Sequence, residues 1–213
     1  MVVSAGGTRE PIDAVRVIAN RSSGKQGYAI AGEAAARGAQ VTLVTTVELA
    51  TPAGVTAQRV ETAAQMDAAM RRLAPQADVV VMAAAVADFR PATVAGGKLK
   101  KRDGAPDIVL EPTADILAGL GAAKPAGQTL VGFAAETADL LANAEAKLTR
   151  KNLDLIVAND VSQPGVGFQH ETNAVTLVRR GGFITTVDLA DKRAIASAVL
   201  DAVAELRSSP TAG

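Results

Sequence analysis

The chain has 213 residues but no cysteine, and its single histidine is His170. Without cysteine there is no disulfide, no zinc–thiolate site and no thiol nucleophile, which fits a reducing compartment such as the cytoplasm. His170 lies in a polar stretch, where we expect an exposed or structural role. Because there is no second histidine, a multi-histidine metal site is excluded, and no Ser-His-Asp constellation is recognisable.

Aromatic residues, net charge and long apolar runs are also scarce. Aromatics make up 2% of the chain, too few for base-stacking platforms of the single-strand-binding kind. Lysine plus arginine (22) balances aspartate plus glutamate (22), which disfavours a general binder of nucleic acid or anionic membrane. The longest uncharged apolar run, residues 79–87, is too short to span a bilayer. The first residues lack the pattern of a signal peptide.

Short β-branched runs alternate along the chain with longer alanine-rich stretches. This alternation predicts one α/β domain, a three-layer Rossmann-like sandwich on a mostly parallel sheet. We expect Gly38 to end the first helix and Thr113 to cap the third. Expected strands cover residues 2–4, 40–46, 78–84, 129–133 and 153–158, and expected helices cover 26–37, 63–73, 113–120, 138–150 and 191–206.

Three regions depart from a plain doubly wound domain. Residues 174–178 and 183–187 flank an Arg-Arg-Gly-Gly turn and predict an antiparallel hairpin at an edge of the sheet. Residues 90–111 read as an excursion, part flexible loop and part short strand at 107–110. The chain begins abruptly in a strand, which suggests a missing upstream segment, and residues 208–213 read as a flexible tail.

Two segments that follow strands could meet a ligand, because ligands in open α/β sheets bind beyond the carboxyl ends of the strands. S-A-G-G-T-R-E-P at residues 4–11 permits close backbone approach to a ligand, or is simply a turn with a surface arginine. N-R-S-S-G-K-Q-G at residues 20–27 favours an anion cradle at a helix N-terminus, although a plain serine N-cap would look similar. It is not a Walker A loop, because Gln26 follows Lys25.

Three further segments are candidates for the same site. Residues 83–90 combine small residues with Asp88, which suits a flat ring and a ribose, a base or a metal, or only tight packing under a helix. Lys98 follows two glycines, which would let a mobile loop carry it over the charge of a phosphate. A run of lysines is equally often a solvent-exposed surface. Phe133 could pack on a base or fill the core. Lys147 and Lys151 share one helix face and are phosphate-ligand candidates.

Taken together, these segments resemble one family, phosphopantothenate–cysteine ligase, in its bacterial CTP-dependent form. That form is normally the C-terminal half of a bifunctional coenzyme A biosynthesis protein. The matching motifs, in family order, are S-A-G-G-T-R-E-P-I-D (4–13), N-R-S-S-G-K-Q-G (20–27), A-A-V-A-D-F-R (84–90), K-L-K-K (98–101), V-G-F-A-A-E-T (131–137), R-K-N-L-D-L-I-V-A-N-D-V (150–161) and G-F (167–168).

The resemblance implies a two-step ligation by a domain covering residues 1–207. The carboxylate of 4′-phosphopantothenate attacks the α-phosphate of CTP, and L-cysteine then displaces CMP from the acyl-cytidylate. Implied partners are these substrates, Mg²⁺ or Mn²⁺ held mainly through the triphosphate with Asp88 as a further candidate ligand, and a second copy of the chain contacted through the excursion. The upstream half of such proteins is an FMN-dependent decarboxylase.

The resemblance also assigns roles to individual residues. Lys98 and Asn20 are the implied catalytic pair, Lys98 on the mobile loop and Asn20 at the acyl intermediate. Two alternatives remain: an NAD(P)- or flavin-binding reductase, which the absent G-x-G-x-x-G disfavours, and a non-catalytic nucleotide-binding module. The implied CTP site is Met82, Ala83, Ala84, Asp88, Lys98, Ala114, Asp115, Ile116, Leu117, Phe133, Lys147 and Lys151, and the implied substrate site is Asn20, Ser22, Ser23, Gly24 and Ala85.

Overall fold

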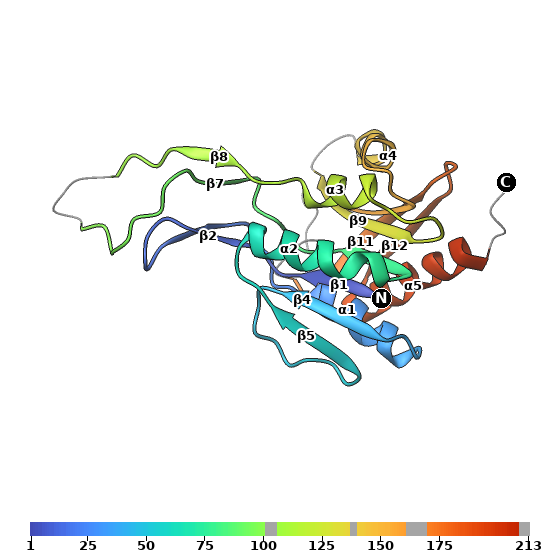
Figure 1. Ribbon diagram of the computed structural model, residues 1–213. Helices are drawn as coiled ribbons and strands as arrows, with labels where there is room; N and C mark the ends of the chain where they lie inside the picture. Colours follow the sequence, from blue (N-terminus) through green and yellow to red (C-terminus); the bar gives the residue numbers. More distant parts are fainter. Residues whose placement is uncertain (101–105, 137–139, 161–169, 209–213) are drawn as a thin grey trace.

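The computed structural model describes residues 1–100, 106–136, 140–160 and 170–208, and Figure 1 shows their arrangement. An eight-stranded sheet forms the centre, in the order β12-β11-β10-β9-β6-β1-β4-β5. The expected features at Lys101, Thr137, Val161, Gly167-Phe168 and the C-terminal tail beyond residue 208 lie outside the described residues. The parallel strands are β1 (Val2–Ala5), β4 (Val41–Thr45), β5 (Val55–Arg59), β6 (Val79–Met82), β9 (Thr129–Glu136) and β10 (Leu155–Asp160).

Two helical layers cover this sheet, as the α/β alternation predicts. Side chains alternate between the faces of a strand. In β6, Val81 therefore packs with α1 (Lys25–Ala36) and α5 (Lys192–Ser208), whereas Val80 packs on the other face with α2, α3 and α4. Those three helices are α2 (Ala63–Leu73), α3 (Ile116–Ala122) and α4 (Leu140–Arg150), and a 3-10 turn, η1 (Ala74–Gln76), follows α2.

Local sequence signals place most helix ends. Thr62 and Gln65 form a capping box at the start of α2, whose bounds match the prediction. Gly38, with φ of 88°, follows α1 as expected of a residue just beyond a helix. The cap predicted at Thr113 is wrong. The Thr113 hydroxyl donates to the Ala87 carbonyl, and the Asp115 carboxylate caps α3 by accepting from the Ala118 N–H at 3.0 Å.

The strand predicted at 153–158 begins two residues later than expected, at Leu155. Leu153 belongs instead to the connection from α4, where its N–H donates to the Leu148 carbonyl and the preceding Asn152 has a φ of 52°. Strand β5 was not predicted, because its V-T-A-Q-R sequence lacks the apolar run of a buried strand and it forms the exposed edge beside β4.

The C-terminal hairpin is confirmed. Strands β11 (Thr172–Arg179) and β12 (Ile184–Asp191) pair antiparallel, and β11 also pairs antiparallel with β10, so both extend one edge of the sheet. Gly181 and Gly182 in the turn both have positive φ, which glycine adopts without strain. Within the described residues, no helix is long and apolar enough to cross a membrane.

The excursion forms an arm that projects from the sheet (Figure 1). Its strands are β7 (Phe89–Pro91) and β8 (Leu110–Pro112), so the short strand expected at 107–110 begins three residues too early and ends two residues too early. The pairing partner decides this position, because Arg90 lies opposite Glu111 and their side chains form an ion pair at 2.8 Å. A second, unpredicted hairpin of β2 (Arg9–Pro11) and β3 (Val17–Ala19) lies alongside.

Candidate functional site

A cavity of about 380 Å³ lies at the carboxyl ends of β6, β9 and β10, within the size range of small-molecule sites. The chain runs outward from β1 through β4 and β5 and then returns to β6, so the strand order reverses between β1 and β6. Ligands of open α/β sheets bind at such reversals. The cavity lies beside this reversal.

The wall after β6 is held by two buried hydroxyls. Ser4 accepts a hydrogen bond from the Ala84 N–H at 3.1 Å, and Thr8 accepts one from the Ala87 N–H at 2.9 Å. The Ala85 N–H donates to the Gly6 carbonyl at 2.8 Å. Small residues 83–87 are thereby fixed with their backbone along the cavity, as a flat ligand would require.

The two glycines after β1 support this wall and do not line the cavity themselves. A Cβ at Gly7 would lie 2.5 Å from the Asn20 carbonyl oxygen, and a Cβ at Gly6 would lie 2.2 Å from the Thr46 hydroxyl. The glycines of residues 4–11 therefore allow two loops of the protein to pack closely against each other, and not a ligand to approach the backbone. The structure favours the turn interpretation of this segment.

The segment from Asn20 to Gly27 lines the cavity beside that wall. Gly24, with φ of 75°, is the N-cap of α1, and no side chain caps this helix, so the serine N-cap alternative is wrong. The Asn20 amide donates to the Val86 carbonyl at 2.9 Å and ties the two segments together. Uncapped N–H groups at a helix start are the donors that an anion needs.

Lys147 in the last turn of α4 and Lys151, the residue directly after that helix, enter the cavity wall on the opposite face of the sheet from α1. The Lys151 ammonium lies 2.8 Å from the Asp115 carboxylate at the start of α3. Burial opposes ionisation of Asp115, but the hydrogen bond from Lys151 and the N–H of Ala118 outweigh it, so the pKa of Asp115 is lowered. At the end of the cavity near the start of α3, the Lys151 ammonium is therefore paired with the Asp115 carboxylate.

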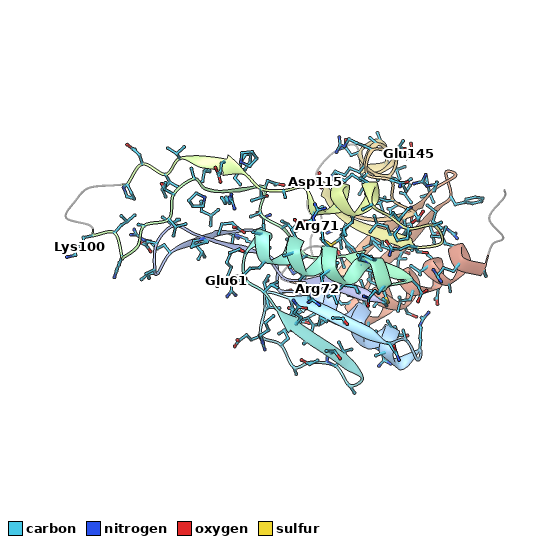
Figure 2. The ribbon with its side chains drawn as sticks, in the orientation of Figure 1. Glu61, Arg71, Arg72, Lys100, Asp115 and Glu145 are labelled. Carbon is cyan, nitrogen blue, oxygen red and sulfur yellow. The ribbon has the colours of Figure 1, made fainter. Side chains whose placement is uncertain are left out.

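Lys98 is the one expected site residue that the structure does not place in the cavity wall. It is exposed on the arm, and Figure 2 shows Lys100, two residues further on, well away from Asp115. Its segment is attached to the β2–β3 hairpin, because the Leu99 N–H donates to the Asp13 carboxylate at 3.1 Å. All the other expected residues line the cavity together.

Several cavity residues were missed by the sequence analysis. Asn159 directly follows the strand predicted at 153–158, a position that could have revealed it, although in the structure it lies within β10. Lys192 is the first residue of α5, where a cation opposes the helix dipole, and that unfavourable placement is its only sequence signal. Gln26, Gly27, Val86 and Ala87 lie in candidate segments 20–27 and 83–90 but were not named singly as site residues, and the remaining missed residues are Thr113, Ala134, Ala135 and Asn173.

Metal binding by protein groups alone is not supported in the part of the chain that the structure describes. It contains no cluster of three or more histidine, aspartate or glutamate side chains that could hold a metal ion. Asp88 and Asp115 are the described carboxylates in the cavity wall. His170 is exposed and is not part of that wall.

Comparison with known proteins adds an independent finding. Residues 1–206 match the family model of the DNA/pantothenate metabolism flavoprotein C-terminal domain. The coenzyme A biosynthesis bifunctional protein CoaBC of Mycobacterium tuberculosis H37Rv is 49% identical over 95% of this chain and 51% of its own length. The protein of the same name from Escherichia coli K12 is 48% identical over 85% of this chain and 46% of its own length.

A solved structure is similar over almost the whole chain. The crystal structure of the C-terminal domain of a coenzyme A biosynthesis bifunctional protein CoaBC has a TM-score of 0.82 and 40% identity, and it covers 96% of this chain and 93% of that one. The chain thus spans about half the length of the curated relatives it matches, and nearly all of this solved domain.

Proposed function

The chain belongs to the family of the DNA/pantothenate metabolism flavoprotein C-terminal domain, and on that basis we propose that it ligates 4′-phosphopantothenate to L-cysteine with CTP. The observation that carries this proposal is the cavity at the ends of β6, β9 and β10. It brings together every expected nucleotide and substrate residue except Lys98. The relatives are named for coenzyme A biosynthesis, which includes such a ligation.

The proposed reaction has two steps, and neither needs a protein nucleophile. A carboxylate oxygen of 4′-phosphopantothenate attacks the α-phosphorus of CTP, the bond to the β-phosphate oxygen breaks, and pyrophosphate leaves. The amine of cysteine then attacks the acyl carbon and loses a proton. The acyl carbon–oxygen bond breaks, and CMP leaves with its electron pair. A chain with no cysteine and one exposed histidine suits this chemistry.

Different groups of cavity residues are proposed to bind the nucleoside, the phosphates and the acyl intermediate. The backbone of residues 82–84 and 114–117, with Phe133, is proposed to surround the cytosine and ribose. Lys147 and Lys151 are proposed to hold phosphate oxygens. Asn20 and the uncapped start of α1 are proposed to hold the acyl intermediate, with Ser22, Ser23, Gly24 and Ala85 beside it.

Lys98 is proposed to act on the charge that develops at the α-phosphate and the acyl oxygen. Because it is exposed on the arm and outside the cavity wall, it has to approach the cavity from there, or from the arm of a second copy. Positioned cations act most strongly where charge develops in the transition state.

Mg²⁺ or Mn²⁺ would fit this cavity only together with the nucleotide. Magnesium is usually held by one or two carboxylates plus substrate phosphates, and of the two described carboxylates in the cavity wall Asp88 is the one that does not cap a helix. Such an ion would neutralise phosphate charge. We further propose a homodimer contacting through the arm, a cytoplasmic location, and an FMN-dependent decarboxylase half in the full-length protein.

A pyrophosphate-release assay tests the proposed function. With CTP and 4′-phosphopantothenate, pyrophosphate should form in a burst without cysteine and continuously with it, and ATP should give at least about tenfold lower kcat/KM. A purine in a pocket shaped for a pyrimidine leaves buried polar groups without hydrogen-bond partners, and each such group costs about 1–3 kcal/mol of free energy. No pyrophosphate from either nucleotide would reject the ligase proposal, and equal efficiency with ATP would reject the CTP assignment.

A further inference from the structure

The turn between β2 and β3 is built around one buried carboxylate, that of Asp13. Its side chain is fully buried, and its Oδ1 atom accepts hydrogen bonds from the Val15 and Arg16 N–H groups, both at 2.8 Å. The Arg16 guanidinium donates to Oδ2 through its Nε at 3.0 Å. An aspartate that accepts from backbone N–H groups a few residues ahead stabilises a tight turn. The turn therefore holds this carboxylate and this guanidinium together.

The Asp13–Arg16 pair also binds both backbone polar groups of Leu99. The Leu99 N–H donates to Oδ2 of Asp13 at 3.1 Å, and the Leu99 carbonyl accepts from Nη2 of Arg16 at 3.0 Å. Hydrogen bonds to charged groups are stronger than those between neutral groups. One residue of the arm is thus attached to the turn at two points.

A further backbone contact attaches the same segment a few residues earlier. The Ala95 N–H donates to the Ile12 carbonyl at 3.0 Å. Residues 96–98 therefore form a short bridge, and both of its ends are bonded to one turn. A Cβ atom added to Gly96 or Gly97 would have no other atom within 4 Å. The ends of this bridge, and not packing around its two glycines, decide where it lies.

Lys98 is the last residue of this bridge and directly precedes Leu99. It is exposed, and Figure 2 shows the neighbouring Lys100 on the arm. A lysine side chain on a free glycine loop has many conformations, and most of them must be given up before its ammonium can act at one point. Attachment of both ends of the bridge removes part of this conformational freedom in advance.

We propose that Asp13 is a positioning residue for Lys98. Together with Arg16, it holds the Leu99 backbone and thereby sets the point from which the lysine approaches its target. This inference rests on the proposed function, in which Lys98 acts on charge that develops at the α-phosphate and the acyl oxygen. A cation is most effective when it is positioned before that charge develops. The hydrogen bond from Arg16 lowers the pKa of Asp13, so the carboxylate remains ionised near neutral pH.

Asp13→Asn is the first test. Its side-chain oxygen can still accept from the N–H groups of the turn, but its NH₂ group then faces the Leu99 N–H, and both are donors. We expect kcat at saturating substrates to fall about tenfold or more, while the KM for CTP stays within about twofold. The assay is run well below the melting temperature of the variant, because this change also removes an ion pair.

A double variant separates positioning from general damage. If Asp13 acts through Lys98, Asp13→Asn combined with Lys98→Gln should have a kcat within about twofold of that of Lys98→Gln alone, because the effects of coupled residues are not additive. A merely structural role of Asp13 would instead lower kcat by the same factor in both backgrounds. That result would overturn the proposal.

Leu99→Pro provides a second variant that leaves the Asp13–Arg16 pair in place. It removes only the N–H donor of the exposed arm, so we expect a lower kcat and a nearly unchanged melting temperature. Wild-type kcat in Leu99→Pro would overturn the proposal.

The matched control is Glu111→Gln, which breaks another ion pair of the arm, between Glu111 and Arg90 on β8 and β7. Because this pair lies on the surface, its loss should leave kcat within about twofold of the wild type. A fall in kcat as large as that of Asp13→Asn would show that any disturbance of the arm slows the reaction, and would also overturn the proposal.

Hydrogen exchange at the Leu99 N–H tests the contact without any activity assay. Exchange should be about tenfold or more faster in Asp13→Asn than in the wild type, as for the loss of one hydrogen bond to a charged group. A wild type that releases pyrophosphate but exchanges this proton freely would reject the positioning role alone. A wild type that protects the proton but releases no pyrophosphate would reject the ligase proposal, and the role of Lys98 with it, while the attachment of Leu99 would be confirmed.

Discussion

The Lys151 ammonium and the Asp115 carboxylate lie 2.8 Å apart and join the end of α4 to the start of α3 across the cavity wall. Asp115 is also the helix cap of α3, so one carboxylate holds both the helix and the lysine. The Lys151 side chain is 18% exposed, which limits its movement. Lys151 is therefore held in position before any nucleotide binds.

This placement predicts that Lys151→Gln mainly raises the KM for CTP. A cation held in place contacts phosphate in the ground state and in the transition state alike, so its loss weakens binding and leaves kcat nearly unchanged. We expect a rise of roughly tenfold, as for one hydrogen bond to a charged group. Steady-state kinetics with varied CTP measure it. A large fall in kcat at unchanged KM would contradict the anchoring role.

Lys98→Gln is expected to behave in the opposite way. Lys98 is exposed on the arm and absent from the cavity wall, so it contributes little to ground-state binding. If it meets the developing charge, kcat should fall about a hundredfold with little change in the KM for CTP. Lys100→Gln, on the same exposed stretch, is the matched control. A variant with raised KM and intact kcat would make Lys98 an anchor only.

Asn20→Asp is expected to lose most turnover and keep the fold. The Asn20 amide donates to the Val86 carbonyl, and a carboxylate there would face that oxygen and a phosphorylated substrate. Because Asn20 is exposed, thermal unfolding should change little. The measurement is kcat/KM for 4′-phosphopantothenate beside a melting curve. Wild-type turnover would remove Asn20 from the site.

Asp13→Asn is expected to destabilise the protein near pH 7 and not in acid. The hydrogen bond from Arg16, aided by N–H groups including that of Leu99, lowers the pKa of Asp13 well below its ordinary value of 3.8. A carboxyl whose pKa is lowered by folding stabilises the protein above its unfolded pKa, and this stabilisation is lost as pH falls through the folded pKa. Chemical denaturation of both proteins from pH 7 downward measures it. A pH-independent difference would contradict this account.

Some of the fold and site could be read from local patterns alone. The buried strand β6, the capping box of α2 and the glycine turn of the β11–β12 hairpin each depend on neighbouring residues. The carboxyl ends of parallel strands meet at one edge of a sheet, so the segments after them were expected together. Lys147 and Lys151 were expected on one face of a helix because they lie four residues apart, and in the structure Lys147 is in the last turn of α4 and Lys151 directly follows it.

Other features depended on partners far away in the sequence. The arm strand β8 lies where Arg90 meets Glu111, and α3 begins at Asp115 because the Thr113 hydroxyl is used by the Ala87 carbonyl. No local pattern contains either partner. Likewise, nothing near Lys98 in the sequence shows that its segment is attached to Asp13.

The sequence by itself determined three features, because each depends only on residue type and short spacing. These are the alternation of strands and helices, the motifs at the strand ends and the absence of cysteine. The corner formed by Gln26, Asn159, Asn173 and Lys192 exists only in the tertiary structure. Its members come from four segments, and α1 and α5 meet only because both cover one face of the sheet. Packing of the two helices against that face, and not any local signal, decided which lysine is buried beside the cavity.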